Sequence, residues 1–149
     1  MKSLYLSILL CFFGLTGIKA QLAETLHQVI KIDSLEDLSI QLWNLDDTYK
    51  WEVKAWPARN IMVETKVTMT NGSEPILKFF IENERYALKI EREGLKGILS
   101  NKPEQRRIIK TAKGEASDII QIIIYLPEDF KEVNTGVFSK KVKENNSRE

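Results

Sequence analysis

The sequence predicts a mainly β fold, with a single small β-sheet domain that is sandwich-like or the start of a short solenoid, and one crossover helix. Polar and apolar residues alternate from Asn60 to Thr70, which is the pattern of a half-buried strand. The stretch from Ile119 to Leu126 is strongly hydrophobic, as in a central strand. Between them, Ser73 to Pro75 is typical of a helix start, with a capping serine and an early proline.

The N-terminus, residues 1–20, has the pattern of a cleavable secretory signal peptide. Lys2 gives a positive start, an apolar run follows from Leu4 to Ile18, and Ala20 is a small residue at the expected cut. The run is shorter than the roughly 20 apolar residues that a transmembrane helix needs. We therefore expect an exported protein, periplasmic, on the cell surface or extracellular, with no transmembrane segment after signal cleavage.

Cys11 is the only cysteine and lies inside the predicted signal peptide. A bacterial lipoprotein would be cut just before such a cysteine, but the apolar residues Phe12 to Leu15 follow it, where a lipoprotein turns polar. The cleavable signal peptide is therefore favoured over a lipid anchor on Cys11. The mature chain would then have no disulfide, and with His27 as its only histidine it lacks the ligands of a Cys and His zinc site.

Charge and length limit the classes of function. Removal of residues 1–20 takes away two lysines and leaves 20 basic and 21 acidic residues, for a net charge of −1. A nucleic-acid-binding domain has a marked basic excess, so no nucleic-acid partner is expected. The remaining 129 residues suit one domain.

Residues 21–37 are expected to be a weakly structured lead-in or a short helix, because their apolar residues fall at helix-like spacing. The β-rich domain is expected over residues 38–138. It begins with alternating strands at Ser39 to Trp43 and Trp51 to Ala55, and Pro57 ends the second because proline cannot donate to a ladder.

After the Asn60 to Thr70 strand, a short helix is expected from Glu74 to Glu84, although Asn71-Gly72 leaves a hairpin open. Residues 139–149 are rich in lysine, asparagine and serine and are expected to form a disordered basic tail. The remaining expected strands are Tyr86 to Glu91, Ile98 to Ser100, Arg107 to Lys110, and Ile119 to Leu126, which Pro127 ends.

The order of these segments resembles a known family. A strand led by Asn60 to Val63 precedes the helix, and a late strand ends in a Tyr125-Leu126-Pro127 step. Over roughly residues 39–133 this is similar to the adhesin domains of bacterial envelope proteins, of the GIN-domain kind found in Bacteroidota. The resemblance implies a non-enzymatic binding or structural module. We expect a short form without the long β-solenoid that follows in the family, because the 22 residues after Pro127 turn lysine-rich.

Aromatic residues cluster at Trp43, Tyr49, Trp51 and Trp56. Exposed rings can anchor a partner or stack on a sugar, whereas rings that share a strand face with apolar residues belong to the core. Trp51 shares a face with the apolar residues of its strand, which favours the core. Trp56 has the opposite parity and precedes Pro57, so it is the candidate for a partner-binding side chain.

A basic stretch provides the other candidate partner-binding residues, Arg106, Arg107 and Lys110, with Lys102 and Lys113 beside them. Such a stretch can meet an anionic glycan or a phosphate headgroup. It can equally be a solvated edge, where lysines discourage pairing between sheets. Arg106 and Arg107 would point to opposite faces of a strand, which favours the solvated edge.

Other sites have weaker support. His27 lies in the lead-in and is expected to be an ordinary surface histidine. Asp46 and Asp47 offer oxygen ligands, but the spacing of a calcium loop is missing, so they are expected to make a turn. Glu64 and Glu82 could belong to a pair of catalytic carboxylates if they faced one cleft.

We therefore expect a non-enzymatic envelope protein without cofactor or metal, whose partner is an unknown envelope protein or a glycan. Two alternatives stay open. One is a small hydrolase that uses acidic residues on the β-scaffold. The other is a carrier of apolar ligands, which needs an enclosed cavity lined by Trp51, Val63 and Ile122.

Overall fold

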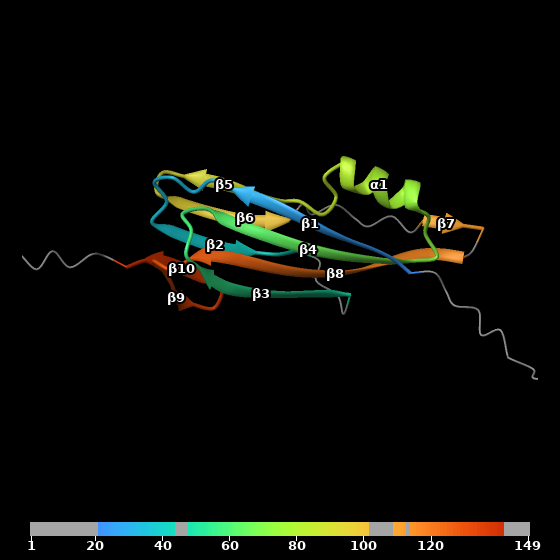
Figure 1. The fold of residues 1–149 in the computed structure, drawn as a ribbon. Coiled ribbons are helices and arrows are strands. Elements are labelled where there is room, and N and C mark those ends of the chain that lie inside the picture. Colours follow the sequence, from blue (N-terminus) through green and yellow to red (C-terminus); the bar gives the residue numbers. More distant parts are fainter. Residues whose placement is uncertain (1–20, 44–47, 102–108, 113, 142–149) are drawn as a thin grey trace, which may run out of the picture.

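Two β-sheets lie face to face in the computed structural model, which describes residues 21–43, 48–101, 109–112 and 114–141 (Figure 1). The mainly β fold predicted from the sequence is therefore confirmed, in its sandwich-like form. The predicted signal peptide, the turn at Asp46 and Asp47, and Arg106 and Arg107 lie outside the described residues. No helix in these ranges is long and apolar enough to cross a membrane.

The first layer, called here the long sheet, has the strand order β1-β4-β8-β3, with a short strand β7 also paired to β8. The pairing of β3 with β8 is parallel and the other pairings are antiparallel. The strands are β1 (Leu22–Ile30), β3 (Tyr49–Trp56), β4 (Ile61–Thr70), β7 (Ile109–Thr111) and β8 (Gly114–Pro127).

The second layer, the short sheet, has the order β5-β6-β2-β10-β9. Only the pairing of β2 with β6 is parallel. The strands are β2 (Asp37–Gln41), β5 (Leu88–Glu93), β6 (Lys96–Asn101), β9 (Phe130–Asn134) and β10 (Val137–Lys140).

Alternation along the central strands builds the core. The predicted inward face of β4 is confirmed, since every second residue from Ile61 to Met69 is buried. The same holds on β8 from Asp118 to Leu126, which β4 and β3 flank as expected for a central strand. Burial of these side chains on a sheet face is the main stabilising contribution, at about 25 cal/mol per Å² of apolar surface.

The two sheets differ in length, and the predicted helix fills the difference. β8 has 14 residues, whereas no strand of the short sheet exceeds six. The helix α1 (Glu74–Glu82) leads from β4 to β5 and buries Leu77, with Phe80 packed against the core. It therefore covers the end of the long sheet that the short sheet does not reach (Figure 1).

Two expectations about the chain ends are wrong. Residues 22–30 form β1 rather than a weakly structured lead-in or a helix, because β4 offers a full antiparallel partner from Leu22 to Ile30. The expected disordered tail starts too early, because Ser139 and Lys140 belong to β10 and pair with β9. Residues 142–149 of that tail lie outside the described residues.

Candidate functional site

At the edge formed by β1 and β5, a side chain bridges the two sheets. Gln28 points inward from β1, and its Nε2 donates to the carbonyl oxygen of Leu88 at 2.7 Å while its Oε1 accepts from the N–H of Leu88 at 3.0 Å. The amide thus replaces a neighbouring peptide group at the edge of β5. Arg92 adds hydrogen bonds from its guanidinium to the carbonyl oxygens of Lys31 and Asp33.

The opposite edge, formed by β3 and β9, contains an open groove of about 320 Å³, called here the edge groove. Its position follows from the strand orders, because β3 ends one sheet and β9 ends the other. Trp51 and Ala55 face inward here, but they stay exposed. Its lining combines the apolar residues Trp51, Val53, Ala55, Leu126, Phe130 and Phe138 with the charged residues Lys54 and Glu132.

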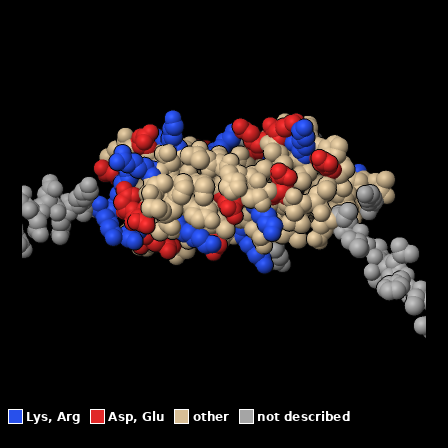
Figure 2. Space-filling model, viewed as in Figure 1, with Lys and Arg blue, Asp and Glu red and all other residues tan. Residues whose placement is uncertain are grey.

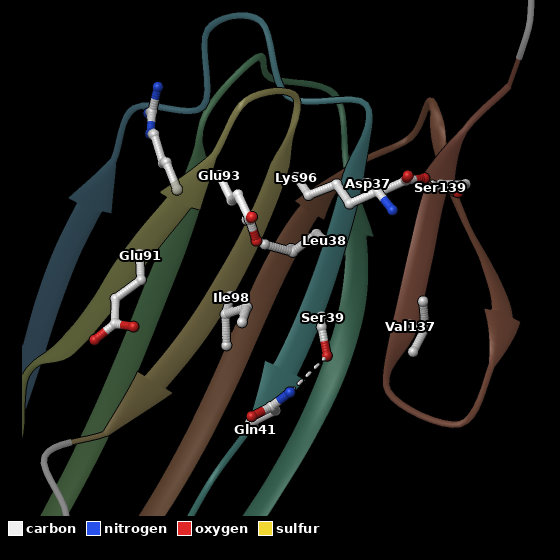
Figure 3. Close-up of a pocket in the computed structure, with 12 residues that line it drawn as sticks. Asp37, Leu38, Ser39, Gln41, Glu91, Glu93, Lys96, Ile98, Val137 and Ser139 are labelled. Atoms are coloured by element: carbon white, nitrogen blue, oxygen red, sulfur yellow. Dashed lines mark hydrogen bonds between the residues drawn. The ribbon is translucent and has the colours of Figure 1, made fainter.

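A larger groove of about 540 Å³ lies on the outer face of the short sheet, called here the outer-face groove (Figure 3). The strand registers place Glu91, Ile98, Ser39 and Val137 in one row across β5, β6, β2 and β10. Ile98 is 37% exposed, although it is a large apolar side chain. The row therefore places two aliphatic side chains, Ile98 and Val137, on either side of Ser39 as a partly exposed floor of the groove.

Polar groups surround that floor. The next row across the same strands is Glu93, Lys96, Asp37 and Ser139, in which Ser139 donates a hydrogen bond to Asp37. Figure 3 shows Gln41 on the other side of the floor, bonded to Ser39. Glu91 and Glu93 are exposed and make no ion pair with another described residue. Their carboxylates are free to accept hydrogen bonds from a partner.

One local feature of the sequence is related to this floor. Ile98 and Leu99 are adjacent in β6, and adjacent residues of a strand point to opposite faces. Leu99 is fully buried, so Ile98 must point away from the core. The neighbours that complete the row come from strands far apart in the sequence, and no local pattern brings them together.

Trp56, the predicted partner-binding ring, is less accessible than expected. It is half-buried, its Nε1 donates to the carbonyl oxygen of Asn60 at 2.9 Å, and its ring lies 6.1 Å from that of Tyr125. Trp43 and Trp51 are more exposed, at 53% and 37%. Trp56 lies on the face of β3 opposite to Trp51, as its parity predicts, but Tyr125 packs beside its ring on that outer face.

Trp56 nevertheless lines a groove of about 640 Å³ at the end of the sandwich, together with Arg59, Asp129 and Lys140. Lys110 is exposed on β7, which pairs with the start of β8, whereas this groove lies at the other end of β8 near Pro127. The described residues therefore do not join Trp56 and Lys110 into one surface. Figure 2 shows acidic and basic side chains interspersed over the visible face, without a large patch of one sign.

The carboxylates named in the sequence do not converge. Glu64 lies on the outer face of the long sheet, 3.4 Å from Nε2 of the exposed His27. Glu82 ends α1, which packs on the inner side of that sheet. The two glutamates are thus on opposite sides of the sheet. Among the described residues, no group of three or more His, Cys, Asp or Glu is placed to hold a metal.

One buried carboxylate joins the helix to the sheet. Asp118 is 8% exposed, and its Oδ2 accepts from the hydroxyl of Tyr86 at 3.1 Å and lies 3.5 Å from Nε of Arg85. The Arg85 guanidinium lies 4.3 Å from the centre of the Phe80 ring. These contacts hold the α1–β5 connection against β8, which is a structural role.

The residues named for an apolar-ligand carrier lie in different environments. Val63 and Ile122 are 1% and 3% exposed in the packed core, whereas Trp51 is at the exposed edge. The structure does not place these three side chains around a shared enclosed cavity.

The chain was compared with models of protein families, with curated proteins and with solved structures, and none of the three comparisons found a match.

Proposed function

We propose that the chain is an exported, non-enzymatic module of the cell envelope, similar to an adhesin, that binds a protein partner through the outer-face groove. Export is supported by the signal-peptide pattern of residues 1–20. The observation that carries the binding role is the row of Glu91, Ile98, Ser39 and Val137, which places two aliphatic side chains on the outer face of a five-stranded sheet.

The chemistry of this groove favours a protein over a glycan. An apolar centre with a polar rim is the usual anatomy of a protein interface. The residues that line the groove include no aromatic side chain on which a sugar ring could stack. Ile98 and Val137 suit an aliphatic side chain of the partner, and Glu91 and Glu93 suit basic groups beside it.

Site-specific photo-crosslinking in the native host tests this proposal. A photoreactive residue at position 98 should give a discrete adduct with an envelope protein, identified by mass spectrometry. The matched control is position 29, since Val29 is a more exposed residue, at 62%, on the outer face of the other sheet. Ile98→Glu in the otherwise native chain should abolish co-purification of the same partner, and Val29→Glu should not.

Two results would contradict the proposal. One is the absence of a position-98 adduct while the protein is correctly exported. The other is binding of purified residues 21–149 to cell-wall glycan that Ile98→Glu abolishes, which would replace the protein partner by a glycan.

A further inference from the structure

The free side of β3 is suited to pairing with another strand. β3 ends the long sheet, and the described part of the chain places no strand on its other side. The N–H of Ile120 donates to the carbonyl oxygen of Thr48 at 2.8 Å, so the even-numbered residues of β3 direct their backbone groups toward β8. Trp51, Val53 and Ala55 therefore direct their N–H and C=O groups outward from the sheet.

The side chains along this edge carry a pattern that complements itself. On the outer face Glu52 and Lys54 alternate in charge, and their side chains meet at 2.7 Å. On the inner face a large residue, Trp51, and a small one, Ala55, lie at equal distances on either side of Val53. A second copy of β3 that runs antiparallel to the first presents both patterns in reverse order. Each residue can then lie opposite its complement.

We propose that β3 pairs antiparallel with β3 of a second copy, about a twofold axis at Val53. Glu52 of each copy then lies opposite Lys54 of the other, and Trp51 lies opposite Ala55. The backbone groups of Trp51, Val53 and Ala55 become the hydrogen-bonded pairs of the new ladder. The two long sheets join into one continuous sheet.

Charge specifies this register. An axis at Glu52 would instead place Glu52 opposite Glu52 and Lys50 opposite Lys54, and like charges directly opposite are destabilising. With the axis at Val53, the four charges of Glu52 and Lys54 alternate both along and across the strands. Contact with Glu52 also raises the pKa of Lys54, which keeps the ammonium charged.

The edge groove receives the indole of the second copy. Ala55 lines the groove of about 320 Å³, and its small side chain leaves the space open. Trp51 of the second copy lies opposite Ala55 in the proposed register and would cover Phe130 and Phe138 at the groove. Tryptophan is the residue type most enriched among side chains that dominate interface energetics. This interface is separate from the outer-face groove, so it does not depend on the proposed function.

Charge exchange tests the register. Sedimentation equilibrium of purified residues 21–149, which include the whole described sandwich, should show a monomer–dimer equilibrium. Glu52→Lys alone and Lys54→Glu alone should each weaken the dimer about tenfold, because each creates two like-charge pairs. The double variant Glu52→Lys with Lys54→Glu should restore it. A wild-type protein that stays monomeric up to about 1 mM, or a double variant no better than the singles, would overturn the proposal.

Cross-linking tests the same contact independently of charge. The mature chain has no cysteine, and Val53→Cys should give a disulfide-linked dimer under mild oxidation, because opposed Cα atoms in an antiparallel pair lie about 5.5 Å apart. Thr25→Cys on β1, the other edge of the long sheet, is the control and should stay monomeric. Equal dimer formation by both variants, or none by Val53→Cys, would contradict the proposed interface.

Discussion

The two long edges of the sandwich differ in their side-chain hydrogen bonds and in the apolar surface that they expose. At the edge of β1 and β5, Gln28 binds both backbone groups of Leu88, and Arg92 binds two carbonyl oxygens beyond β1. At the edge of β3 and β9, the inward-facing Trp51 and Ala55 are left exposed beside a groove. At the first edge Gln28 bonds the backbone groups of Leu88 on β5. At the second edge apolar surface lies exposed beside outward-directed backbone groups of β3.

This difference indicates which edge is available to a partner. An unpaired strand edge is a template for another strand, and proteins usually blunt such edges. A side-chain amide is an effective block because it has one donor side and one acceptor side, as a peptide group has. β3 has no such block among the described residues, and its Glu52 and Lys54 alternate in charge instead of repelling a second copy.

The largest expected effect on stability comes from removing the side-chain amide of Gln28. Gln28→Ala leaves the N–H and C=O of Leu88 without their partner in a half-buried place, which should lower the free energy of unfolding by about 1–3 kcal/mol. Urea denaturation monitored by circular dichroism measures this change. Gln121→Ala is the control, because Gln121 is exposed on β8 and its loss should change stability by less than about 0.5 kcal/mol. Equal losses of stability in the two variants would show that the Gln28 amide does not stabilise the edge of β5.

Filling the edge groove should raise the free energy of unfolding, by less than the loss of the Gln28 amide lowers it. Ala55→Leu adds apolar atoms to the edge groove and should raise the free energy of unfolding of the monomer by about 0.5–1 kcal/mol. The same side chain occupies the place of Trp51 of the second copy, so dimerisation should weaken. Denaturation at low protein concentration separates the first effect from the second. A destabilised monomer would show that the groove is already filled.

Asn101 provides a second side-chain amide, at an exposed position, that can be compared with Gln28. Asn101 bonds the N–H and C=O of Trp43 at 2.7 and 3.0 Å, in the same two-bond arrangement as Gln28 with Leu88. Both bonds are exposed, so water can replace them, and Asn101→Ala should lower stability by about 0.5 kcal/mol. The same denaturation assay measures it. A loss as large as that of Gln28→Ala would mean that burial does not distinguish the two amides.

The sequence predicted the central strands better than the edges. β4 and β8 follow a regular burial pattern, which local alternation reveals. The alternation of polar and apolar residues that predicts a strand is hidden in β1, because Glu24 and Gln28 occupy inward positions while Val29 points outward. Gln28 is polar there because it binds the backbone of β5, a strand 60 residues away. Tertiary contact, and not local propensity, determines that residue.

The candidate surfaces were harder to predict for the same reason. The strands β9 and β10 are short, and Phe130 and Phe138 are the buried residues within them, so their pattern is weak. The edge groove needs β3 and β9, which are more than 70 residues apart in the chain. The outer-face groove likewise combines strands whose order in the sheet differs from their order in the sequence. The exposure of Trp51 and Ile98 depends on that topology.

The most direct test of whether β3 accepts a partner strand is amide hydrogen exchange at residue resolution. The exchange is measured over a range of protein concentrations. The account predicts that the amides of Trp51, Val53 and Ala55 exchange more slowly as the protein concentration rises, while those of β1 do not change. Exchange at these three amides that is the same at every concentration, or slowing along β1 instead, would contradict it.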